Sequence, residues 1–272
     1  LIIISLISIF SPAIKNGVRN LRGALKRKEI PPWTLFAGML GASFVAVQTQ
    51  IVPMIGVAIY SVAAIAGQSA ISLVVDRIGL TGGGKKEITP RRVTAAFVTV
   101  FAVFISVADR LDGKDLSIAA VILGVLAGAI VGLQRAMNGQ INEHSQQSFT
   151  TSLLNFAMGT TFLLVLLLFA MTLGGMKLSP LPAGPWWIYT GGAIGVLYVA
   201  FTSTIVQHLG VLTFTLISVG GQLAGSLLID LYSPTDGVQV SIYLVSGIVL
   251  TYLGVLVGGV RNSQLKRAAT EK

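Results

Sequence analysis

Eight long apolar runs constrain this chain more than any other feature of its sequence. Each run has about 18 residues or more, the length an α-helix needs to cross the roughly 30 Å hydrocarbon core of a bilayer. The runs cover residues 33–52, 55–76, 92–109, 116–137, 150–173, 186–206, 210–231 and 240–260. They predict an all-α polytopic membrane protein in which each run is one membrane-spanning helix.

Charge and residue composition exclude several other classes of protein. Only 11% of the residues are charged, against about 25% in an ordinary soluble domain, so a soluble globular protein is excluded. The net charge is +9, but Lys and Arg lie in short loops beside apolar runs and form no basic surface that would bind nucleic acid. The chain has no Cys, two His and no paired acids within a run. We therefore expect no metal site, no cofactor and no enzymatic activity.

A ninth apolar run, residues 1–14, is too short to cross a bilayer. As one helix it would rise only about 21 Å, less than the hydrocarbon thickness. No basic segment precedes it and no small-residue cleavage site follows it, so it does not resemble a signal peptide. We expect this run to be the end of a span whose beginning precedes residue 1.

Basic loops predict how the chain is oriented. The loop 15–29 carries six Lys or Arg and the loop 77–92 carries five, which favours the cytoplasmic side for both loops. The uncharged turn expected at 52–54 and the acidic turn 109–115 then lie outside. Continued alternation predicts a cytoplasmic C-terminus.

The sequence also repeats itself at an offset of 154 residues, which aligns 31–76 with 185–230 without a gap. Both segments contain the motif G-Q-x3-S-x3-D, and uncommon residues coincide in the two segments, namely Pro31 with Pro185 and Trp33 with Trp187. The offset implies two units of five helices, and an odd number makes the second unit cross the membrane in the opposite sense. We predict a first repeat at 1–112, without its first helix, and an inverted second repeat at 113–272. About nine of ten helices would then be present.

These features resemble the drug/metabolite transporter superfamily, most closely its YdcZ-like bacterial inner-membrane branch. The resemblance is carried by the inverted five-helix units, the tryptophan near the start of a repeated span, the G-Q-x3-S-x3-D helix and an L-Q-x3-N pattern at Leu133, Gln134 and Asn138. It implies a ten-helix small-molecule carrier of the bacterial cytoplasmic (inner) membrane. It further implies an exporter with a central cavity between the two halves.

The repeated motif places polar side chains four residues apart, so they share one helix face in each half. The residues are Gln68, Ser72 and Asp76 in the first half and Gln222, Ser226 and Asp230 in the second. In one interpretation both faces line the cavity and bind substrate, with the Asp residues as possible coupling groups. In the other, Gln and Ser bond neighbouring helices while each Asp lies in water at a helix end. Asp76 would then pair with the adjacent Arg77.

A second group of amides, Gln134, Asn138 and Asn142, has the same spacing within a single run. Three turns of Gln or Asn facing lipid would be costly, so we expect these side chains and Asn155 to line the cavity and bind substrate. Arg135 either extends to the cytoplasmic interface as an anchor or binds an anionic group of the substrate. Trp187 either belongs to an aromatic belt or stacks on the substrate.

The sequence thus favours a secondary-active or facilitative transporter of a small polar or amphipathic metabolite or drug, working by alternating access between the repeats. The alternative is a structural or accessory membrane subunit that transports nothing. The expected partners are the small-molecule substrate and the lipid bilayer, and a homodimer is compatible with this interpretation. Nothing in the sequence identifies the substrate or an energy-coupling ion.

Overall fold

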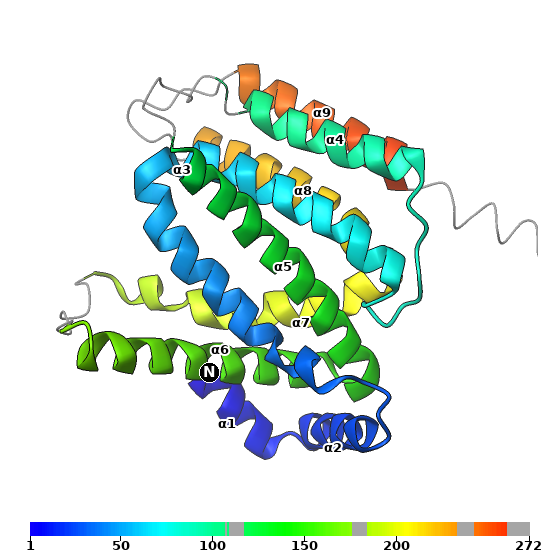
Figure 1. Cartoon of the computed structure of the whole chain (residues 1–272), viewed down its shortest axis with the longest axis vertical. Helices are drawn as coiled ribbons and strands as arrows, with labels where there is room; N and C mark the ends of the chain where they lie inside the picture. The colour runs from blue at the N-terminus through cyan, green and yellow to red at the C-terminus, as the bar shows by residue number, and fades with distance from the viewer. Residues whose placement is uncertain (107, 109–116, 176–183, 233–241, 260–272) are drawn as a thin grey trace, which may run out of the picture. The chain divides into compact units, whose positions relative to one another are not determined.

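The computed structural model describes all residues except 107, 109–116, 176–183, 233–241 and 260–272, and it is helical with no strand among those it describes (Figure 1). This confirms the predicted all-α polytopic membrane fold. The α-helices are α1 (Ile2–Phe10), α2 (Pro12–Lys26), α3 (Ala37–Ile78), α4 (Pro90–Ser106), α5 (Ile118–Ser145), α6 (Ser148–Thr172), α7 (Gly191–Leu209), α8 (Val211–Tyr232) and α9 (Ile242–Gly259). Two short 3-10 helices, η1 (Pro32–Phe36) and η3 (Trp186–Tyr189), precede α3 and α7.

Five helical segments are long and apolar enough to cross a membrane within the described residues. They are Pro32–Ile55, Tyr60–Ile78, Ile118–Ser145, Ser148–Thr172 and Gly191–Leu209, at five of the eight predicted positions. The other three predicted runs are helical as α4, α8 and α9, and α8 and α9 contain the shorter apolar stretches Val211–Gly225 and Val245–Gly254 in the part of the chain described. The first segment begins in η1 and continues into α3, and the second lies wholly in α3, because the chain stays helical around Pro53 where the sequence indicated a turn.

The apolar run at the start of the chain is not one helix, contrary to the prediction. Helix α1 ends at Phe10, and α2 begins at Pro12 with its axis bent by 96° from that of α1. The Ser11 hydroxyl accepts a hydrogen bond from the backbone N–H of Ile14, and proline suits the first helical position because its missing N–H would have no partner there. The capping serine and the proline after it therefore start a new helix within the run, although the run is uniformly apolar.

The chain folds into two compact units, each built from separated stretches of sequence. Unit 1 contains residues 1–45, 80–84 and 133–208; unit 2 contains 46–79, 85–132 and 209–272. Helices of unit 1 bury a cluster of apolar side chains on α1, α2, α6 and α7, and α4 packs against α8 and α9 in unit 2. Each unit thus draws helices from both halves of the sequence.

Segments related by the repeat offset resemble each other locally. Both η1 and η3 follow a proline in extended conformation, with φ −70° and ψ 138° at Pro31 and φ −65° and ψ 149° at Pro185. Helices α4 and α9, which the offset also relates, lie side by side in unit 2 (Figure 1). The predicted boundary at residue 112 separates two sequence repeats, whereas each compact unit combines stretches from both repeats. The division into repeats therefore stays a prediction.

Candidate functional site

Unit 1 holds a group of four amide side chains, which we call the amide cluster: Gln134, Asn138 and Asn142 on α5 with Asn155 on α6. Gln134 Nε2 lies 3.4 Å from Asn155 Oδ1, and Asn155 Nδ2 donates to Asn138 Oδ1 at 2.9 Å. Residues four apart on α5 share a face, and this face meets the first turns of α6. The structure therefore brings Asn155 to two of the three α5 amides, Gln134 and Asn138.

Helix α7 completes the surroundings of this cluster. Asn142 Nδ2 donates to the Thr204 hydroxyl at 3.2 Å, and the Arg135 guanidinium donates to the Tyr198 hydroxyl at 3.1 Å. Arg135 is only 7% exposed, so its charged group stays inside unit 1 and does not reach outward as a membrane anchor. Neither Tyr198 nor Thr204 follows from the sequence, because the helical spacing of α5 does not reveal which helix faces it.

Two glycines at the start of α3 leave room for the amides. A Cβ added to Gly41 would lie 2.3 Å from Gln134 Nε2, and one added to Gly38 would lie 2.0 Å from the backbone oxygen of Asn155. Real Cβ atoms do not approach other atoms so closely. At Gly38 only glycine lets the backbone of α3 pack directly against α6, whereas at Gly41 the side chain of Gln134 would have to move.

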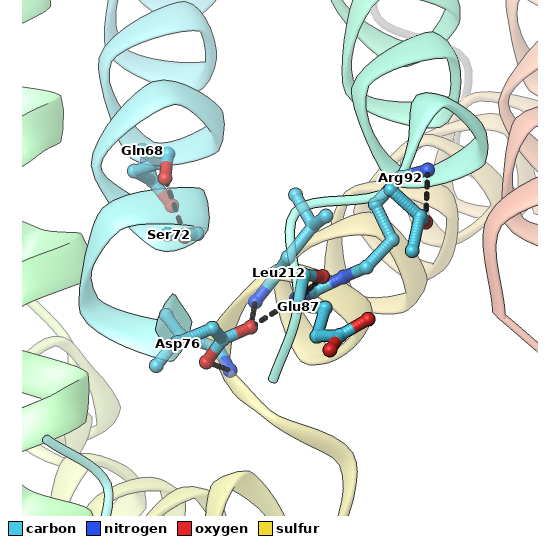
Figure 2. Close-up of polar contacts among 8 residues, drawn as sticks. Gln68, Ser72, Asp76, Glu87, Arg92 and Leu212 are labelled. Atoms are coloured by element: carbon cyan, nitrogen blue, oxygen red, sulfur yellow. Dashed lines mark hydrogen bonds and ion pairs between the residues drawn. The ribbon is translucent and has the colours of Figure 1, made fainter. Parts of the chain in front are cut away.

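Unit 2 contains the polar face of the repeated motif on α3 (Figure 2). Gln68 and Ser72 are both buried, and the Ser72 hydroxyl donates to the backbone oxygen of Gln68 one turn earlier. A serine can satisfy its own hydroxyl in this way without any partner from another helix. Ser72 therefore contributes a bonded hydroxyl to this face.

Asp76 ends this face as an anion bound by three donors. Its carboxylate accepts hydrogen bonds from the backbone N–H groups of Val211 at 2.8 Å and Leu212 at 3.1 Å, and it pairs with the Arg92 guanidinium (Figure 2). Val211 and Leu212 open α8, so the negative charge lies at the positive end of the helix dipole. Asp76 is 0% exposed, so it does not lie in water. It pairs with Arg92 and not with the adjacent, exposed Arg77 that the sequence suggested.

The turn before α8 is shaped around this carboxylate. Gly210 has φ +84°, and a Cβ there would lie 2.8 Å from both Asp76 Oδ2 and Lys86 Cδ. The backbone N–H of Lys86 donates to the Asp76 carbonyl oxygen at 2.8 Å. Burial lowers the pKa of the Lys86 amine, while the nearby negative charge of Asp76 acts in the opposite direction. Gly210 is thus required by both backbone conformation and lack of space.

Two further predicted residues, Gln222 and Trp187, join neither constellation. Gln222 is exposed on α8, and Trp187 is 61% exposed with its ring edge-to-face against Trp186, at 6.1 Å between ring centroids. The side chains of Ser226 and Asp230 lie outside the part of the chain whose side chains are described. Among the described residues, no three His, Asp or Glu side chains gather as metal ligands would.

Comparison with known proteins gives one match. A family model described as "Putative inner membrane exporter, YdcZ" matches residues 1–105 and 119–257. No curated protein and no solved structure matches the chain.

Proposed function

The chain belongs to the YdcZ family of inner membrane exporters, and from this premise we propose that it moves a small polar or amphipathic metabolite or drug out of the cell by alternating access. Membership makes it a membrane transporter in general terms. The substrate class, the direction and the mechanism are the proposed parts, and either secondary-active or facilitative transport fits them.

The observation that carries the proposal is the unused hydrogen-bonding capacity of the buried amide cluster. Asn138 is 4% exposed, and its Oδ1 accepts from Asn155, but no hydrogen bond within the described residues uses its Nδ2. Asn142 donates to Thr204 while its Oδ1 has no partner there either. A neutral amide offers both donors and an acceptor. Such groups suit a polar, uncharged part of a substrate, which can accept a hydrogen bond from Asn138 and donate one to Asn142.

The other predicted residues take secondary places in this proposal. Gln68, Gln222 and Trp187 are proposed as further substrate contacts, with Ser72 and Ser226 beside the two glutamines on their helices. Asp76 and Arg135 already have charged or polar partners, which favours positioning roles for them. Asp230 stays a candidate for coupling.

Transport by reconstituted protein tests the proposal. Proteoliposomes containing the chain would be screened for uptake of mixed polar and amphipathic metabolites, followed by variants Asn138→Leu and Asn155→Leu. We expect each variant to lower transport at least about tenfold, the effect of losing one good hydrogen bond to a bound group. Gln50→Leu is the matched control, because Gln50 is an exposed amide in a predicted run outside the cluster.

The same variants separate binding from packing. If the amides only join helices, the leucine variants would melt at lower temperature in detergent, and the folded fraction would still transport normally. The paired variants Gln68→Leu and Gln222→Leu test the repeated motif in the same assay. A wild-type chain that transports no member of the screen would instead favour the accessory-subunit alternative.

A further inference from the structure

Helix α2 presents four basic side chains on one face, which we call the basic stripe: Lys15, Arg19, Arg22 and Lys26. Their spacings of four, three and four residues keep them within one stripe along the helix. All four residues are exposed, and none has an ion-pair partner among the described residues. Helix α2 therefore offers four adjacent positive charges that the described part of the protein leaves unneutralised.

The opposite face of α2 is fixed against α6, so the stripe must point away from unit 1. Ile14, Gly17, Leu21 and Ala24 are buried. A Cβ on Gly17 would lie 2.2 Å from Thr150 Oγ1, and that hydroxyl donates to the Ile14 carbonyl at 3.2 Å. Asn20 Nδ2 adds a bond to the Ser145 carbonyl oxygen at 3.3 Å. These contacts set the rotation of α2 about its own axis.

Helix α1 indicates where the hydrocarbon ends. Its outward side chains are large and apolar, with Phe10 83% exposed beside exposed Ile3 and Leu6, and it packs on the candidate span α6. Such a surface suits lipid, whereas four exposed cations do not. The chain bends by 96° between α1 and α2, so α2 runs nearly perpendicular to α1 and does not continue its apolar surface.

We propose that α2 is an interfacial helix whose basic stripe binds the headgroups of anionic phospholipids. Guanidinium and ammonium groups form charge-assisted hydrogen bonds with phosphate oxygens, and a cluster of four or more at a membrane surface attracts anionic lipid. The basic residues predict the cytoplasmic surface for this contact. The lipid surface is distinct from the amide cluster and does not depend on the transported substrate.

Lipid selectivity in proteoliposomes tests this surface. The full chain is reconstituted in phosphatidylcholine with trace spin-labelled phosphatidylglycerol or spin-labelled phosphatidylcholine, and electron paramagnetic resonance gives the association of each label with the protein. We expect phosphatidylglycerol to be preferred, and the preference to fall at least about fivefold, the contribution of one surface cation, when all four stripe residues become Gln. The pair Arg19→Gln and Arg22→Gln should give part of that loss.

Matched controls keep the result specific to α2. The triple variant Arg77→Gln, Lys85→Gln and Arg91→Gln removes exposed basic residues from the other basic loop and should lower the preference clearly less than the four-residue variant, while the charge-conserving pair Arg19→Lys and Arg22→Lys should keep it. An equal loss in the triple variant, or no loss in the four-residue variant with unchanged melting, would overturn the proposal. Competition by inorganic phosphate gives a further test. If phosphate abolishes the preference and chloride at equal ionic strength does not, the stripe is a site for free anions and the proposal is overturned. If the four-residue variant fails to fold, the two Arg pairs decide: equal preference in both overturns it.

Discussion

The carboxylate of Asp76 is held by groups from two other helices, Arg92 at the start of α4 and the first N–H groups of α8. A buried carboxylate is costly without such partners, and removing it leaves the remaining charge buried and unpaired. The Arg92 side chain has 11% relative exposure. Asp76 therefore contributes to the stability of unit 2 whatever it does in transport.

The first prediction concerns this ion pair. Asp76→Ala should lower the free energy of unfolding by about 3–5 kcal/mol, because it removes the cap of α8 and leaves Arg92 unpaired. Unfolding by sodium dodecyl sulfate in mixed micelles measures the change. Arg77→Ala, at the adjacent exposed residue, should stay within about 0.5 kcal/mol.

A double variant separates the pair from the cap. Asp76→Ala with Arg92→Ala should cost clearly less than the sum of the two single changes, because residues in one ion pair are not additive. Additive losses would mean that the carboxylate acts only through the N–H groups of α8, and that its pairing with Arg92 adds nothing to stability.

Sequence spacing predicts which polar residues share a helix face, but not what they face. The i, i+4 pattern placed Gln134, Asn138 and Asn142 on one helix face, and the structure bonds Asn155 to the first two of them. It could not find Arg92 as the partner of Asp76, because that pairing depends on the path of the loop between α3 and α4. Gly210 was equally hidden, since its role depends on a carboxylate far away in the sequence.

At the scale of whole helices, runs of apolar residues predicted where helices lie better than they predicted where helices break. Length and composition are local properties, so five spans appear where expected. The chain stays helical around Pro53, where a turn was expected, and breaks at Ser11, where none was. Proline explains both: inside a membrane helix it can be tolerated, whereas after a capping serine it starts a new helix.

The second prediction uses the repeat as its own control. Gly38→Ala should lower the free energy of unfolding by about 1–3 kcal/mol, because its Cβ would collide with the backbone of α6. Gly192→Ala, at the position 154 residues later, meets nothing within 4 Å and should be neutral or stabilising, since alanine favours the helix by up to about 1 kcal/mol.

Both glycine variants would be measured in the same mixed micelles. Equal losses of unfolding free energy at Gly38 and Gly192 would show that the two repeats pack alike. The close approach of α3 to α6 would then not explain the effect of Gly38→Ala.

At the scale of the whole molecule, orientation follows from the basic loops but does not follow from packing. Helices can pack identically in a chain inserted in either direction, so only the charge of the loops predicts the orientation in the membrane. The division of the chain into two interleaved units is likewise absent from the pattern of apolar runs, because such runs do not say which helices meet.

The third prediction tests orientation with single cysteines in a chain that has none. In intact cells, a membrane-impermeant maleimide should label Gly184→Cys, in a loop predicted to lie outside, and should label Asn16→Cys only after permeabilisation. Both residues are exposed, so access depends on the side of the membrane. The reverse pattern would invert the topology and move α2 to the opposite surface.

The bonds of Asp76 also set an order of events during translation. Val211 lies 135 residues after Asp76, so at about 5–20 residues per second the ribosome needs roughly 7–27 s to supply the N–H groups that cap it. Arg92 follows after only 16 residues. The nascent chain can therefore pair this carboxylate with Arg92 long before α8 exists, and we expect Arg92 to act first as an early counter-ion and only later as one of three hydrogen-bonding partners.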